Sequence, residues 1–129
     1  MKYLIPFDNF ELINENYKYA HINFIPPKTV SNQAKKGLKY RRKYKPLKGE
    51  LGVRMANKLI HRDKITPAKV KQMATFFSRH RSREILDKFK DEPWKDKKYV
   101  THLLWGGDSG RAWAEKVRSQ MARADKKQK

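Results

Sequence analysis

Apolar residues recur at helical spacing in several stretches of the chain. The clearest stretch follows Thr66-Pro67, where a capping hydroxyl before a proline is a typical helix start. Its apolar positions follow the i, i+3, i+4, i+7 pattern and are Val70, Met73, Ala74 and Phe77. This pattern predicts a helix from residue 66. The cluster Arg79-His80-Arg81-Ser82-Arg83 either ends it or lets it run on to Phe89.

Three further helices are expected. The first begins at Ser31 as cap and has a narrow apolar stripe of Ala34 and Leu38. The second spans residues 50–60, with one side predicted to face the core; that side carries Leu51, Met55 and Leu59. The last is capped by Asp108 or Ser109 and has apolar residues at i, i+4 and i+8, namely Trp113, Val117 and Met121.

Breaks separate these helices. Proline and glycine in residues 45–49 end the first, and residues 90–98 form a charged loop around Pro93. A short apolar segment, residues 99–105, then reaches Gly106-Gly107, which predicts that two helices meet at a glycine corner.

The two ends of the chain differ from this middle part. Residues 1–27 alternate aromatic and polar positions up to Pro26-Pro27, which indicates an extended aromatic arm that packs on this domain or on a neighbour. Residues 123–129 have the composition of a disordered basic tail. The sequence therefore predicts an all-α fold, a single small domain of four to five short helices over residues 28–122, with an extended N-terminal arm and a basic C-terminal tail.

Composition narrows the possible chemistry. With no cysteine among 129 residues, disulfides, thiolate zinc sites and cysteine nucleophiles are excluded, and a reducing compartment is expected. The start of the sequence, Met1 to Pro6, lacks the apolar stretch of a signal peptide. No apolar run approaches the length of a membrane span, so no membrane partner is expected.

Charge points to an anionic partner. The chain holds 32 Lys and Arg against 13 Asp and Glu, a formal net charge of +19, and self-repulsion of this size opposes a compact fold unless anions neutralise it. The charge is concentrated in residues 28–62, which contain twelve Lys and Arg against a single acid, Glu50.

The densest basic stretch, residues 35–45, also contains aromatic residues. Cations suit phosphates, and tyrosine rings can stack on exposed bases, so this stretch is the preferred nucleic-acid site. The predicted binding residues are Lys35, Lys36, Lys39, Tyr40, Arg41, Arg42 and Lys43, with Arg79 and Arg81 extending the surface. The alternative is a solvated face with Tyr40 and Tyr44 tucked into the core. No motif indicates base-specific readout.

Other constellations are weaker. Residues 51–73 could be a helix-turn-helix, but the connection 61–65 is longer than that motif uses. Arg79-His80-Arg81 could bind a phosphate or, through His80, provide a base, but a cationic helix face is the preferred interpretation. The histidines, His21, His61, His80 and His102, are too far apart in sequence for a zinc motif. Nucleophile elbows, P-loops and dinucleotide fingerprints do not match. We therefore expect no catalytic residues, no metal and no cofactor, and a protein that is not an enzyme.

Residues 105–113 are the most unusual stretch. Glycines before a helix N-terminus could bind an anion. The preferred interpretation is a structural corner in which the glycines let Trp105 and Trp113 pack, because Asp108 at that N-terminus would repel phosphate.

A resemblance adds a biological setting. Ordered landmarks across residues 26–118 include Pro26-Pro27, Gly37-Leu38, Phe76-Phe77, Arg79-His80 and Trp105-Gly106-Gly107-Asp108 followed by Gly110 and Trp113-Ala114. They resemble an uncharacterised domain common in tailed bacteriophages, which has an Arg-His helix end and a Trp-Gly-Gly-Asp-x-Gly corner. This chain departs from it with Ser78 and Ser109 in place of alanine, and with a charged loop at residues 82–98 in place of a glycine-rich one.

The resemblance implies a phage protein but no mechanism. Together with the charge, it favours a basic nucleic-acid-binding protein, with DNA expected ahead of RNA, located in the host cytoplasm or the virion. Two alternatives stay open. One is a virion structural or adaptor protein that docks on capsid or portal subunits through its aromatic arm. The other is an inhibitor of a host nucleic-acid enzyme.

Overall fold

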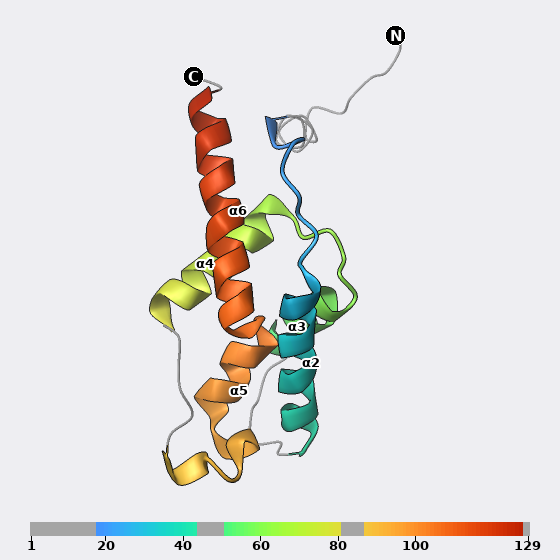
Figure 1. Ribbon diagram of the computed structural model, residues 1–129, viewed down its shortest axis with the longest axis vertical. Coiled ribbons are helices and arrows are strands. Elements are labelled where there is room, and N and C mark those ends of the chain that lie inside the picture. Colours follow the sequence, from blue (N-terminus) through green and yellow to red (C-terminus); the bar gives the residue numbers. More distant parts are fainter. Residues whose placement is uncertain (1–17, 44–50, 81–86, 128–129) are drawn as a thin grey trace.

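The computed structural model describes residues 18–43, 51–80 and 87–127, and over this part of the chain it contains helices and no strand (Figure 1). The all-α prediction is confirmed. The helices are, in order, α2 Lys28–Lys43, α3 Leu51–Ile60, α4 Pro67–Arg79, the 3-10 helices η2 Asp87–Phe89 and η3 Pro93–Lys95, α5 Lys97–Leu104 and α6 Gly107–Lys127.

Helix α2 is central to the packing. It lies against α3, α5 and α6, while α4 packs against α6. In Figure 1, α5 and α2 lie side by side in the lower half, and α6 rises above them past α4. The apolar stripes of these helices meet in one core, whose fully buried side chains include Val30, Met55, Leu59, Val70, Met73, Phe77, Val100, Leu103, Val117 and Met121.

The start of α2 corrects the expected cap. The helix begins at Lys28, because the Pro27 carbonyl accepts hydrogen bonds from the amides of Val30 and Ser31 at 3.0 and 3.2 Å. Ser31 is therefore inside the first turn and not the cap. It is buried, and its hydroxyl donates to the Ile60 carbonyl at 3.1 Å, so it joins α2 to the end of α3.

Helix α3 matches the predicted range over the described residues, with one correction. Met55 and Leu59 are buried as expected, but Leu51 is 49% exposed. As the first residue of α3, Leu51 precedes the turn at which the helix meets the core. The arrangement agrees with the prediction against a helix-turn-helix, because α3 packs on α2 whereas α4 packs on α6.

Helix α4 starts as predicted. Thr66 is the N-cap, its hydroxyl accepts a hydrogen bond from the Lys69 amide at 3.2 Å, and Pro67 follows in the first turn. The helix ends at Arg79 and Phe89 belongs to η2, so of the two alternatives the helix that ends at the arginine cluster is the one observed. Residues 81–86, which hold most of the arginine cluster, lie outside the described part of the chain.

The glycine corner between α5 and α6 is confirmed, but its cap differs. Gly106 and Gly107 have φ angles of 109° and 64°, in the left-handed region that favours glycine. The Gly106 carbonyl accepts the Gly110 amide at 2.8 Å, so α6 begins at Gly107. Asp108 therefore lies in the first turn of α6 and neither it nor Ser109 precedes the helix. Trp105 and Trp113 are both buried beside this corner.

Both ends of the described chain pack onto the helices. Helix α6 runs to Lys127, so the prediction of a disordered tail is wrong for residues 123–127. The Asp125 carboxylate accepts a 2.7 Å hydrogen bond from the Tyr19 hydroxyl and pairs with the Lys18 ammonium at 2.9 Å. These contacts raise the pKa of Lys18 and lower that of Asp125. Ala124 is buried in the same region.

Residues 18–27 form the described part of the aromatic arm. Tyr19, Ile22 and Phe24 are buried in the same core as the helices, and the Phe24 carbonyl accepts the Ile65 amide at 2.9 Å. This part of the arm therefore packs on its own domain. Residues 1–17, with Phe7 and Phe10, lie outside the described residues. No helix in the described part of the chain is both long and apolar enough to cross a membrane.

Candidate nucleic-acid interface

The predicted basic ridge is an exposed face of α2. Lys28, Lys35, Lys39 and Arg42 are spaced at helical repeats and are all exposed, so they form one outer row along the helix. Lys36 and Lys43 are also exposed and lie one step around the helix on the stripe that contains Tyr40. We call these six cations the α2 basic face.

Helix α2, which carries this face, and helix α3, which packs beside it, have no acidic residue in the described part of the chain. Helix α3 adds the exposed cations Arg54 and Lys58. Ion pairs between described residues join Lys18 to Asp125, Lys95 to Glu92, His102 to Asp108 and Arg111 to Glu115, and no cation of the α2 basic face takes part in them. The cations are therefore available to an external anion.

Two predicted site residues of α2 differ from the others. Arg41 is half-buried and follows Gly37 by one turn, which places it on the α5-facing side of the helix. Tyr40 is half-buried and packs against the core. It is therefore neither a fully exposed ring nor a fully buried core residue. Tyr44 lies outside the described residues.

Arg79 is not part of the α2 basic face. It is exposed at the end of α4, a helix that packs on α6. In Figure 1, α5 and α6 lie between the yellow-green end of α4 and the teal α2. Arg81 lies outside the described residues. The structure therefore brings the α2 cations together but not Arg79 with them.

The end of α4 has a structural role. The Phe76 ring stacks on the Trp105 ring, with ring centroids 4.4 Å apart and an interplanar angle of 5°. The His80 ring also contacts Phe76, with ring centroids 4.7 Å apart. His80, considered above as a phosphate ligand or base, is exposed and lies against the ring of Phe76 at the edge of the core.

The glycine corner is filled by protein atoms. A Cβ at Gly106 would lie 2.8 Å from the Gly110 Cα and 2.9 Å from a Val30 methyl, and one at Gly107 would lie 2.5 Å from the Gln33 amide oxygen. Asp108 near the α6 N-terminus contacts the imidazole of His102, Oδ1 to Nε2, at 3.1 Å. This geometry supports the structural interpretation of the corner over an anion site.

His102 is a buried histidine whose pKa is lowered in the folded protein. It is 4% exposed, meets Phe77 edge-on at 5.4 Å, and its Nδ1 has no hydrogen-bond partner. Burial lowers the pKa of His102, while the Asp108 carboxylate acts in the opposite direction and Arg111 adds to the lowering. The folded protein therefore keeps this imidazole neutral under conditions in which an exposed one is charged.

This shift predicts a loss of stability in mild acid. In the unfolded chain His102 titrates near its ordinary pKa of 6.5, so below that pH the unfolded state binds more protons than the folded state. The contribution of neutral His102 to the free energy of unfolding is present above pH 6.5 and is lost progressively as the pH falls toward the lower pKa of His102 in the folded protein. Thermal melts from pH 8 to pH 5 should show the melting temperature fall, and H102Q should flatten the profile. The exposed-site variant H21Q should follow the wild-type profile; an H102Q profile as steep as wild type would contradict the assignment.

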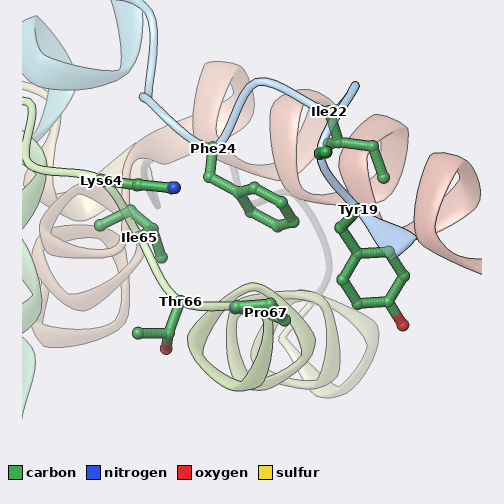
Figure 2. A pocket seen from close by; sticks show the side chains of 8 residues that line it. Tyr19, Ile22, Phe24, Lys64, Ile65, Thr66 and Pro67 are labelled. Carbon is green, nitrogen blue, oxygen red and sulfur yellow. The ribbon is translucent and has the colours of Figure 1, made fainter. Parts of the chain in front are cut away.

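One pocket lies away from the basic face. Its volume is about 250 Å³, and it is lined by residues of the N-terminal segment and of the start of α4. Figure 2 shows Tyr19, Ile22 and Phe24 on one side and Ile65, Thr66 and Pro67 on the other. Lys64 is its single charged lining residue. The lining offers no acid-base pair, and most of it is core surface.

Sequence reasoning missed two aromatic residues beside the basic face. Trp94 lies in η3 and Tyr99 in α5, and both are half-buried next to Tyr40. A tryptophan inside the charged stretch 90–98 was the available signal, because a large aromatic residue there has no apolar stripe of its own to join. No group of three His, Cys, Asp or Glu side chains suited to a metal ion occurs among the residues described.

Comparisons with protein-family models, curated proteins and solved structures give no match to this chain.

Proposed function

We propose that this protein binds nucleic acid through the α2 basic face, by contacts to the phosphate backbone that are largely independent of sequence. The observation that carries the proposal is a row of unpaired, exposed cations on one helix with no acidic residue on that helix or on α3. Lysine and arginine rows of this kind release counterions from nucleic acid when they bind it.

The same observation favours the backbone over the bases. Lys28, Lys35, Lys39 and Arg42 follow one line along the helix, as phosphates follow one strand. The proposed setting remains a bacteriophage, with DNA ahead of RNA, on the strength of the motif resemblance and the total charge. The docking of an aromatic arm on a virion subunit receives no support from Tyr19 and Phe24, which are buried on this domain.

Salt dependence tests the proposal. K35Q and K39Q should each reduce the slope of log K against log salt by about one unit, and the double variant by about two, because each lysine neutralises one phosphate. Fluorescence anisotropy with duplex DNA, single-stranded DNA and RNA across a salt series measures the slope, with a scrambled basic peptide as reference.

R118Q and R123Q are matched controls, since both remove exposed cations from α6, which extends away from α2 (Figure 1). Their slopes should equal that of the wild type. Slopes unchanged in all α2 variants would show that another surface binds. Wild-type binding no tighter than that of the peptide would contradict the function itself and favour a protein partner.

A further inference from the structure

Three aromatic rings from separate elements meet beside the α2 basic face. The ring of Tyr40 on α2 lies 6.3 Å from that of Trp94 in η3 and 6.4 Å from that of Tyr99 on α5. Helices α2 and α5 and the 3-10 helix η3 pack together at the lower end of the molecule in Figure 1. We call these three rings the aromatic shelf.

The aromatic shelf is not part of the main core. Tyr40 packs against the core edge, but Trp94 and Tyr99 belong neither to the buried cluster nor to the partly buried side chains around it. Both are half-buried. A half-buried tryptophan outside the core leaves apolar ring surface at the protein exterior, where aromatic residues commonly serve recognition.

Two lysines of the α2 basic face already lie against the shelf. The Lys43 ammonium is 3.6 Å from the centroid of the Trp94 ring, and the Lys36 ammonium is 5.9 Å from both the Tyr40 and Tyr99 rings. Lys36, Tyr40 and Lys43 are spaced i, i+4 and i+7, so they share one stripe of α2. Ring surface and phosphate-binding charge are therefore side by side.

The nearby charges leave the shelf electropositive. Lys97 and Lys98 at the start of α5 are exposed. Of the acidic residues, Glu92 pairs with Lys95 at 2.9 Å, and the Asp96 side chain caps α5 by accepting the Tyr99 amide at 3.2 Å. Asp91 is exposed in the turn before η3. An approaching polyanion thus meets more cations than carboxylates here.

We propose that the aromatic shelf stacks unpaired bases, which makes single-stranded nucleic acid the preferred ligand of the α2 basic face. The inference rests on the function proposed above. In a duplex each base is covered by its neighbours, whereas a single strand can turn its bases onto aromatic side chains. A base replaces the Lys43 ammonium on Trp94, and the flexible lysine moves to the adjoining phosphate.

The experiment compares a short oligothymidine with a hairpin duplex of equal phosphate number. W94L should weaken single-strand binding about ten-fold, since loss of one stacking residue has roughly that effect, while duplex binding and the salt slope stay unchanged. W94F should retain most of the affinity. Y99L gives an independent removal of ring surface from α5.

Tryptophan fluorescence provides a readout that needs no loss-of-function variant. The chain has three tryptophans, of which Trp105 and Trp113 are buried and Trp94 is half-buried. Oligothymidine should quench the wild-type emission, the hairpin should not, and W94F should remove the quenching.

The outcomes separate the two proposals. Binding with the expected salt slope, but with equal affinity for both ligands and no quenching, overturns the shelf and leaves the basic face standing. The shelf is also overturned if W94L and Y99L weaken the binding of both ligands equally and lower the melting temperature, because the rings would then have a structural role. Wild-type binding no better than the scrambled peptide overturns both.

Discussion

G106A is expected to lower the free energy of unfolding by about 4 kcal/mol, a large fraction of the total for a domain of this size. Gly106 has a φ of 109°, a conformation that costs a residue with a side chain about 1–3 kcal/mol. The added Cβ would also approach the Gly110 Cα at 2.8 Å and a Val30 methyl at 2.9 Å. Overpacking of that kind costs a further ~1–3 kcal/mol, because neither the backbone of α6 nor the buried Val30 side chain has room to move away from the added Cβ.

Urea unfolding followed by circular dichroism measures the effect. G107A is the matched control: Gly107 has a φ of 64°, in the left-handed α region, and its Cβ would meet the end of the Gln33 side chain. That side chain can move, so G107A should cost about 1–2 kcal/mol, and Q33A should relieve part of that loss. If G106A were no more destabilised than G107A, the corner would be able to relax and the packing account would be wrong.

The sequence could predict elements whose signals are local. Helix α4 is an example, because Thr66 and Pro67 set its start within three residues and its apolar period identifies the buried face. The last helix was found for the same reason, from Trp113, Val117 and Met121. The all-α class follows from such periods alone.

The predictions fail where contacts between residues far apart in the sequence determine the local structure. The tail from residue 123 is polar, yet α6 continues because Asp125 binds Lys18 and Tyr19, which is 106 residues away in sequence. Local sequence predicts Ser31 as a cap, whereas its hydroxyl binds the Ile60 carbonyl of another helix. Local propensity contains no information on either contact.

The candidate site divides in the same way. The row of cations on α2 could be predicted, because charge and helical spacing are both present in one segment. The aromatic shelf could not, since Tyr40, Trp94 and Tyr99 come from three elements that only the packing of α2 on α5 and η3 brings together. The sequence places Arg41 among the α2 cations, but it lies one turn after Gly37, on the side of α2 that faces α5.

That packing depends on Gly37, and G37A is expected to lower the free energy of unfolding by about 2 kcal/mol. Alanine would gain about 1 kcal/mol in helix propensity at this mid-helix position. Against this gain, its Cβ would lie 2.8 Å from the Leu104 amide nitrogen and 3.0 Å from the Leu103 carbonyl carbon. Both are α5 backbone atoms, so α2 and α5 would have to move apart along their whole contact.

G52A tests this reasoning, because a Cβ at Gly52 would also approach Leu104 of α5. A Cβ at Gly52 would lie 3.2 Å from a terminal methyl of Leu104, which can rotate away, so G52A should be neutral or slightly stabilising in the same urea experiment. Equal destabilisation of G37A and G52A would show that backbone proximity is not the cause. Because Tyr99 lies on α5 and Tyr40 on α2, the separation forced by G37A should also weaken oligothymidine binding more than hairpin binding, which links the approach of α2 to α5 at Gly37 to the proposed ligand preference.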